Sequence, residues 1–355
     1  MRKKILIINK SQFGYLTDYY KYCEYLRDEF DVTYLCFDVG NKKLQMENVN
    51  IKYVSNKGIK LIRGIRFVIN AFSQALTFNG IIFINYFENC QLLKILLPWK
   101  KMILDIRSLS INPNNKIRAI QNKKIKKATK YFNFTTIISE GLRKQINLDI
   151  KKSEILPLGA DAISTTKKNF GNSIHLLYVG TLNGRNINQT IEGLSIFMKR
   201  NPEITNISYH IVGDGKELPE LKKIVSEIGL NNVITLYGRI PHFELQPFFD
   251  KCNIGGSYIP MTEYYAFQPP TKTFEYILSG MVCIATDTNE NRLLISKENG
   301  VLCEDNPESF ANALDYVYYN RQNYNSETIR NSLKDYTWEN IVNKYLIPIL
   351  NKLED

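Results

Sequence analysis

The residues best suited to chemistry lie in one short segment, Gln268 to Gly280, where two prolines precede a helical pattern and a glycine follows it. A helix that begins at Pro270 or Thr271 leaves its first backbone N–H groups without intrahelical partners, and such groups attract anions. Lys272 adds positive charge there, so a phosphate or diphosphate is the natural ligand, and Glu275 could accept hydrogen bonds from ribose hydroxyls. For this segment alone, the alternative is a capped surface helix that binds only water.

A glycine-containing loop gives a second candidate. The stretch Tyr178 to Asn186 places Gly180 and Arg185 between a strand pattern and a helical pattern. Because ligands of open α/β sheets bind at the carboxyl ends of the strands, Arg185 could reach a diphosphate, although a plain turn fits the spacing equally well. Gly213 and Gly215 also follow a strand, but the third glycine of a dinucleotide fingerprint is missing, so we predict a tight turn there.

The first half of the chain offers fewer candidates. Gly14 connects the first strand pattern to its helix and permits close approach of another group to the backbone. Asp105 and Arg107 lie at the end of a predicted strand and are the best polar candidates for acceptor or sugar contacts, with a structural ion pair as the alternative. No Ser/His/Asp order or paired-acid motif is present, and we identify no general base.

Composition restricts the class of protein. A chain of 355 residues with 44% hydrophobic and 23% charged residues is long enough for two domains with cores, which excludes disorder and a disulfide miniprotein. The apolar run Ile5 to Ile8 is too short for a signal peptide or a membrane span. The three histidines lack metal-ligand spacing, and the six cysteines lie far apart without a CxxC motif. We therefore expect reduced thiols, a cytosolic protein and no metal site.

Charge is distributed unevenly along the chain. Residues 1–165 carry a net charge of +15 and the remainder carries −4. The first half includes the helical pattern Ile59 to Leu76, with Lys60, Arg63 and Arg66 at three-residue spacing, and the stretch Lys116 to Lys130, which has seven basic residues and no acid. This half should therefore face an anionic partner such as a lipid headgroup layer, a polyphosphate or a nucleic acid.

The candidate residues need strands and helices to position them. Short apolar runs alternate with helical patterns throughout, which predicts an α/β fold of parallel sheets covered by helices. The expected strands are 4–8, 32–37, 51–54, 81–85, 102–106, 135–139, 154–156, 174–179, 207–212, 233–237, 254–258, 282–285 and 301–303. A polar linker at 162–173 divides the chain, so we expect domains at 1–165 and 166–336, and a helix at 337–355 that packs back on the first domain.

Taken together, these segments resemble the family 4 glycosyltransferases, retaining nucleotide-sugar enzymes of the GT-B fold. The stretches that carry the resemblance in the second half are YVGTLNGRNINQTIEG, IVGDGKELPELKKIVSEIGLNNVITLYGRIP and PTKTFEYILSGMVCIAT. Three further stretches that resemble the family are TIISEGLRKQI, ILPLGAD and YTWENIVNKYL. The resemblance implies two facing Rossmann-like domains with an interdomain cleft, the first binding the acceptor and the second the donor.

The resemblance also implies residue roles. Arg185, Lys272 and the amides at Thr271 and Lys272 would hold the donor diphosphate, and the two side chains would stabilise the leaving group. Glu275 would bind the ribose and the backbone near Ile240 would meet the base. The remaining candidates are Gly14, Gly180 and Thr273 for donor binding and Arg107 for catalysis. Three positions depart from the family pattern: Phe267 replaces a glutamate that contacts the donor sugar, Thr181 replaces an arginine, and Gly14 stands alone in place of two glycines.

The function implied is transfer of a sugar from a UDP- or GDP-linked donor to a saccharide acceptor, with retained configuration and without an obligatory metal or other cofactor. The basic first half favours a lipid-linked acceptor in bacterial-type surface polysaccharide or glycolipid assembly. It also favours a cytoplasmic enzyme, peripheral at the inner face of an anionic membrane. The alternatives are a nucleotide-sugar 2-epimerase of similar fold and a non-enzymatic protein that binds anionic surfaces or nucleic acid. We expect no nucleic-acid partner because no recognition motif is present.

Overall fold

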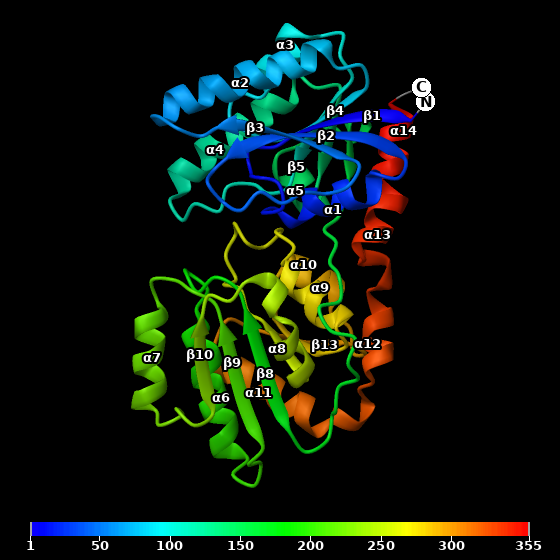
Figure 1. Ribbon diagram of the computed structural model, residues 1–355. Helices are drawn as coiled ribbons and strands as arrows, with labels where there is room; N and C mark the ends of the chain where they lie inside the picture. Colours follow the sequence, from blue (N-terminus) through cyan, green and yellow to red (C-terminus); the bar gives the residue numbers. More distant parts are fainter. Residues whose placement is uncertain (1, 354–355) are drawn as a thin grey trace. The chain divides into compact units, whose positions relative to one another are not determined.

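The chain folds into two compact units in the computed structural model, which describes residues 2–353. The first unit comprises the chain up to Leu158 together with the C-terminal segment from Trp338, and the second comprises Gly159–Thr337. Each unit contains one parallel β-sheet with helices packed on it (Figure 1). The predicted α/β class is therefore confirmed.

The first unit has a seven-stranded sheet of order β3-β2-β1-β4-β5-β6-β7. Its strands are β1 (Lys3–Ile8), β2 (Phe30–Asp38), β3 (Val49–Ser55), β4 (Ile81–Asn85), β5 (Met102–Ile106), β6 (Phe134–Ile137) and β7 (Ser153–Ile155). Its helices are α1 (Thr17–Leu26), α2 (Lys60–Thr77), α3 (Gln91–Leu96), α4 (Asn115–Thr129) and α5 (Glu140–Gln145), then α13 (Trp338–Ile341), a π-helical turn (Val342–Leu346) and α14 (Ile347–Lys352). Chain order reverses between β1 and β4, which is where ligands bind in sheets of this kind.

The second unit has a six-stranded sheet of order β10-β9-β8-β11-β12-β13, with the same reversal between β8 and β11. Its strands are β8 (Ile174–Val179), β9 (Ile207–Val212), β10 (Ile234–Gly238), β11 (Ile254–Ser257), β12 (Val282–Thr286) and β13 (Gly300–Cys303). Its helices are α6 (Ile187–Arg200), α7 (Leu218–Glu227), α8 (Gln246–Lys251), α9 (Thr271–Leu278), α10 (Asn289–Leu294), α11 (Pro307–Tyr319) and α12 (Ser326–Ser332). All thirteen predicted strands are present, with ends displaced by two residues at most.

The chain crosses from one unit to the other seven residues earlier than the predicted boundary at 165. The backbone N–H groups of Ile163 and Ser164 both donate to Oγ of Ser279, at 3.0 and 3.3 Å, and the Ser164 hydroxyl donates to Asp250. Hydrogen bonds rather than linker composition therefore fix residues 159–165 to the second unit.

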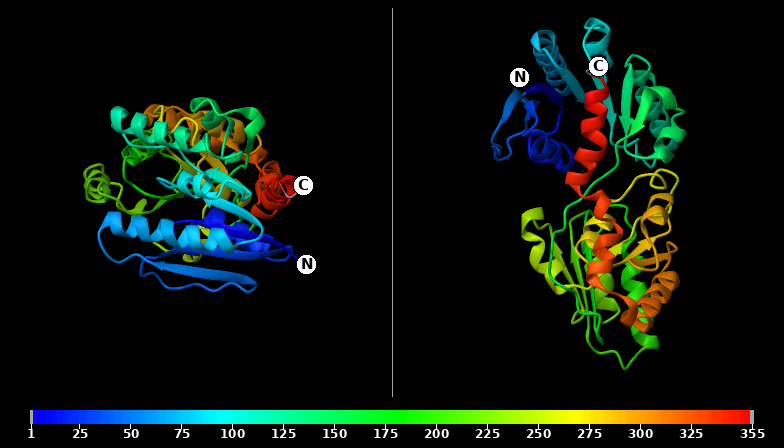
Figure 2. Two further views of the ribbon diagram at one scale, coloured as in Figure 1. Left: turned by 90° about the horizontal axis from the view of Figure 1, so that it is seen from above. Right: turned by 90° about the vertical axis from the view of Figure 1, so that its right-hand side faces the viewer.

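The C-terminal helical segment lies against the first unit and appears red in Figures 1 and 2. Trp338 is 1% exposed and packs edge-on against Tyr22 of α1, with ring centroids 5.8 Å apart. At the other end of the segment, Lys352 pairs with Glu154 at 2.6 Å. Burial of this large aromatic ring stabilises the return of the chain to the first sheet.

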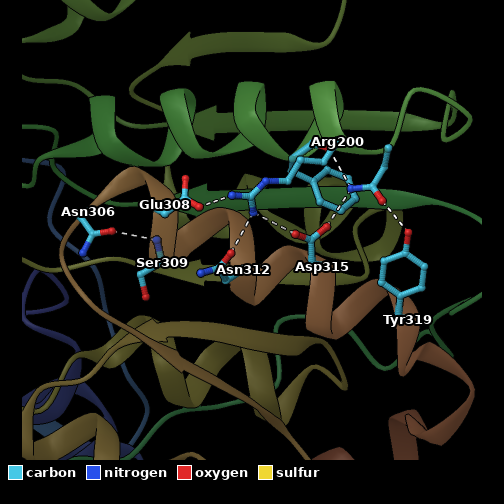
Figure 3. Close-up of polar contacts among 9 residues, drawn as sticks. Arg200, Asn306, Glu308, Ser309, Asn312, Asp315 and Tyr319 are labelled. Atoms are coloured by element: carbon cyan, nitrogen blue, oxygen red, sulfur yellow. Dashed lines mark hydrogen bonds and ion pairs between the residues drawn. The ribbon is translucent and has the colours of Figure 1, made fainter.

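A polar network joins α6 to α11 (Figure 3). Arg200 at the end of α6 donates to Asn312 at 2.8 Å and to Asp315 at 3.2 Å, and it also pairs with Glu308. Gly193 permits the close approach of the two helices, because a Cβ atom there would lie 2.7 Å from the carbonyl oxygen of Pro307. The network therefore joins the end of α6 to α11.

Candidate active site

The start of α9 presents its amides at the carboxyl edge of the second sheet. Pro270 is the N-cap residue and keeps an extended backbone, so the helix begins at Thr271, as the two prolines predict. The N–H groups of Thr271 and Lys272 belong to the first helical turn and have no acceptor inside the helix. The helix dipole adds partial positive charge at this point.

Lys272 lies across the loop that follows β8. Its ammonium group sits over the Tyr178 ring, 3.9 Å from the centroid, and the Tyr178 hydroxyl donates to the Thr181 carbonyl at 2.7 Å. Glycine is favoured at position 180 by its positive φ of 148°, and a Cβ atom there would also lie 2.9 Å from Nζ of Lys272. The glycine, the aromatic ring and the lysine thus hold each other in one arrangement.

Arg185 lies at the end of the same loop and stacks on a different aromatic ring. Its guanidinium carbon is 4.3 Å from the Tyr265 centroid, and its Nη1 atom is buried without a hydrogen-bond partner in residues 2–353. The next residue, Asn186, has a left-handed backbone (φ 53°) and donates to Asp305 at 3.1 Å. The guanidinium is therefore positioned, yet retains an unused donor.

The two cations lie close enough to affect each other. Desolvation, with the Arg185 charge as the second cause, lowers the pKa of Lys272 to about 7. Within the described chain, no carboxylate lies within 4.0 Å of either cation, although the more distant Glu275 raises the pKa of Lys272. An arrangement that concentrates unneutralised positive charge beside free amides is suited to a multiply charged anion.

Glu275 lies one turn into α9 and is largely buried, with a side chain 12% exposed. Its Oε1 atom is 3.1 Å from Nε2 of His242, a residue in the segment after β10. This contact brings Glu275, the residue predicted to bind the ribose, next to the segment that contains Ile240. Sequence spacing does not predict this contact, because His242 and Glu275 lie 33 residues apart.

A pocket of about 420 Å³ lies at the ends of β8, β9 and β10. Its lining includes the predicted residues Gly180 and Ile240, and Thr181, Asn183 and Arg239. Backbone from the turn after β9 completes it: a Cβ atom at residue 213 would lie 1.9 Å from the Gly180 carbonyl oxygen. That turn is therefore a tightly packed glycine turn, as predicted, and it also lines the pocket.

Two predicted residues have other roles. The Thr273 side chain is fully buried and its hydroxyl bonds to Ser257 and Asn291, at 2.7 and 2.8 Å, so it cannot reach a donor. Arg107, proposed for catalysis, pairs through Nε with Asp18 at 2.7 Å and donates through Nη1 to the Leu156 carbonyl at 2.6 Å. Its guanidinium is thus part of a buried ion pair in the first unit.

Gly14 lies in the loop after β1 of the first unit and has a positive φ of 88°. This left-handed backbone favours glycine, and a Cβ atom there would also come within 2.3 Å of the Leu44 side chain. Among residues 2–353, no cluster of three or more His, Cys, Asp or Glu side chains could hold a metal ion.

The functional contacts that the sequence did not predict are aromatic. Lys272 lies on the ring face of Tyr178, and Arg185 lies on the ring face of Tyr265. Asp305 accepts from Asn186, which follows Arg185, and from the Met261 amide at 3.3 Å, so it joins the loops that contain Arg185 and Tyr265. No sequence motif marks these partners, because each lies in a different segment from the cation it contacts. Phe267, which replaces the family's glutamate, lies in the same loop as Tyr265 and is half-buried.

Comparisons with known proteins agree with this fold. Residues 173–320 match the family model described as Glycosyl transferases group 1. Three solved structures similar to the chain are a sucrose-phosphate synthase from Thermosynechococcus elongatus (16% identity, 99% of both chains, TM-score 0.76), Anabaena HepE in complex with UDP and glucose (14%, 99% and 100%, 0.77) and the lipopolysaccharide outer core galactosyltransferase WaaB (16%, 98% and 99%, 0.72). No curated protein sequence matches the chain.

The family match lies on the unit that contains Lys272, Arg185 and the pocket, and the structural matches extend over both units. The chain therefore has the GT-B fold, and its second unit carries the match to the glycosyl transferases of group 1.

A desolvated lysine such as Lys272 should destabilise the folded protein when no anion is bound beside it. We predict that Lys272→Met raises stability by about 1–2 kcal/mol in the absence of ligand, because it removes a desolvated charge. The pKa of Lys272 in the folded protein is lowered to about 7. Its charge therefore lowers the free energy of unfolding of the wild type by the full amount below pH 7, and by less as the pH rises above 7. Thermal unfolding from pH 5.5 to 9 should show the largest gain at low pH.

The control for this variant is Lys216→Met, on an exposed lysine in the same unit, which should change stability by less than about 0.5 kcal/mol. A loss of stability in Lys272→Met at every pH would contradict a desolvated, unneutralised lysine.

Proposed function

We propose that this protein is a glycosyltransferase that moves a sugar from a nucleotide-sugar donor to a lipid-linked saccharide, with retention of anomeric configuration, as in family 4 enzymes. The observation that carries the proposal is the pair of unneutralised cations, Lys272 and Arg185, beside the free amides at the start of α9. Diphosphate is the group of a nucleotide-sugar that such a site would bind.

In this proposal the second unit holds the donor. The diphosphate lies on the amides of Thr271 and Lys272 and on the two cationic side chains, and Glu275 accepts hydrogen bonds from the ribose. The base lies in the pocket of about 420 Å³ that Ile240 helps to line. HepE, a structural neighbour, was crystallised with UDP and glucose, which supports UDP as the first donor to test.

Catalysis then rests on charge that develops on the leaving group. When the glycosidic bond to the diphosphate breaks, negative charge accumulates on the β-phosphate, and Lys272 and Arg185 stabilise it without having to move into place. In other enzymes, preorganised charge of this type lowers the activation free energy by several kcal/mol. A lowering of about 1.4 kcal/mol makes the reaction tenfold faster. We propose that these groups make a metal ion or other cofactor unnecessary.

The acceptor and location follow from the first unit. Its net positive charge supports an anionic, lipid-linked saccharide and a peripheral position at the cytoplasmic face of a membrane, in surface polysaccharide or glycolipid assembly. The neighbour WaaB, a lipopolysaccharide galactosyltransferase, supports an acceptor of this class.

The direct test is turnover with a panel of UDP- and GDP-sugars and a lipid-linked saccharide acceptor. We expect one donor to release nucleoside diphosphate only when acceptor is present, and the new linkage to keep the donor's anomeric configuration by NMR. Absence of both turnover and nucleotide binding would refute the proposal. Epimerised donor formed without acceptor would instead identify a nucleotide-sugar 2-epimerase.

Donor-site variants test the assigned residues. Glu275→Ala and Lys272→Ala should each weaken nucleotide binding by about tenfold or more, because each removes a charged hydrogen-bond partner. Isothermal titration calorimetry with UDP and GDP measures the change, and Glu220→Ala, on an exposed glutamate of α7, is the matched control. Unchanged affinity in both site variants would place the nucleotide elsewhere.

The pH dependence of donor binding tests the role of Lys272 as a cation. The diphosphate of a nucleotide-sugar has no proton to lose near neutral pH, so the lysine dominates the profile. Since its pKa is about 7 in the free protein, affinity should be constant below pH 7 and fall by up to about tenfold per unit above it. Lys272→Arg, whose charge persists, should give a flat profile. A flat wild-type profile from pH 6 to 9 would exclude this role.

A further inference from the structure

The outer surface of α2 is apolar where a surface helix is normally polar. Of its 18 residues, α2 buries only Phe67, Ala71 and Ala75. Its large aliphatic side chains face solvent instead, and Leu61 is 69% exposed and Ile69 60% exposed. The neighbouring α3, which contacts α2 (Figure 1), continues this surface. We call it the α2–α3 face, made of Leu61, Ile62, Ile65, Ile69, Leu76, Leu92, Ile95 and Leu96.

The α2–α3 face is hollowed between the two helices. A groove of about 660 Å³ is lined by aliphatic side chains of both helices, with Lys10, Lys60 and Glu88 among its lining residues. The Glu88 carboxylate pairs with Lys124, so it does not leave a net negative charge there. Gly64 lines this groove, and a Cβ atom there would contact nothing within 4 Å, so the groove is open at this point of α2.

Positive charge surrounds the α2–α3 face at both ends. Lys57 and Lys60 are exposed at the start of α2, and neither α2 nor α3 contains an acidic residue. Beyond the end of both helices, a second pocket is lined by Arg2, Lys4 and Lys100 together with Trp99, which is 67% exposed. Aliphatic residues flanked by lysine, arginine and tryptophan are the composition of helices that lie in a membrane interface.

We propose that the α2–α3 face docks on an anionic lipid bilayer, with its aliphatic side chains in the headgroup boundary and the flanking basic residues against lipid phosphates. No helix in residues 2–353 is long and apolar enough to cross a membrane, so α2 lies along the bilayer surface. A second copy of the chain is a poorer occupant, because a symmetric pair through this face would bring two basic rims together.

This inference makes the membrane contact hydrophobic as well as electrostatic. The stretch Lys116 to Lys130, largely within α4, is the most basic part of the sequence, and charge alone would select it as the contact. The α2–α3 face adds aliphatic burial, which salt does not screen, to a positive rim, which salt does screen. Docking does not depend on which donor or acceptor the enzyme uses.

Vesicle flotation of the full chain tests the proposal, using phosphatidylcholine vesicles with and without 30% phosphatidylglycerol. Wild-type protein should float with the anionic vesicles, and Ile65→Ser/Ile69→Ser should lower the partition coefficient by about tenfold or more. Leu293→Ser, which changes an exposed leucine of the second unit (76% exposed), should bind as wild type. Equal binding of the double variant and the wild type would overturn the proposal.

Tryptophan fluorescence reports the same event independently. The chain has two tryptophans, and Trp338 is buried, so a blue shift on adding anionic vesicles should come from Trp99 and should vanish in Trp99→Phe. A shift that persists in Trp99→Phe would contradict the proposed orientation.

Two controls are the sedimentation of the protein without vesicles and its thermal stabilisation by UDP or GDP. Wild type and Ile65→Ser/Ile69→Ser should both sediment as the same species and keep the same nucleotide response, so loss of docking is distinguishable from loss of folding or of the donor site. A wild-type dimer that the double variant abolishes would assign the face to a second copy and overturn the bilayer proposal.

Discussion

The donor site depends on two positive charges that have no carboxylate within 4.0 Å among residues 2–353. Lys272 is desolvated against Tyr178, and Arg185 keeps a buried donor atom unused while it stacks on Tyr265. Apart from the contacts with the two tyrosine rings, holding such groups together is unfavourable in the isolated protein, since their mutual repulsion and lost hydration both disfavour the folded state. Their presence is understandable if an anion supplies the missing charge.

The rest of the second unit positions these groups. Parallel strands bring the loops after β8, β9 and β11 to one edge of the sheet, and the glycine turns allow the loops to pack closely. Asp305 ties the end of the Arg185 loop to residue 261, and the contact between α6 and α11 holds both segments. The fold therefore fixes the cations partly through residues that line the pocket and partly through residues outside it, such as Asp305.

Local signals made much of this predictable. Continuous apolar runs gave every strand, and the prolines before α9 correctly gave its start, because both features act over a few residues. Arg107 was harder to interpret because its partners, Asp18 and the Leu156 carbonyl, lie 89 and 49 residues away. Thr273 follows Lys272 directly, yet one residue rotates a helical side chain by about 100°, into the core. The tyrosine rings that contact Lys272 and Arg185 could not be predicted, because only the fold brings these distant segments together.

The account rests on where a donor's diphosphate binds, and a crystal structure with UDP or GDP measures that directly. We predict diphosphate oxygens within hydrogen-bonding distance of the Thr271 and Lys272 amides, of Nζ of Lys272 and of Nη1 of Arg185. A nucleotide bound at another place, with both cations still resting on their tyrosines and no anion beside them, would contradict it.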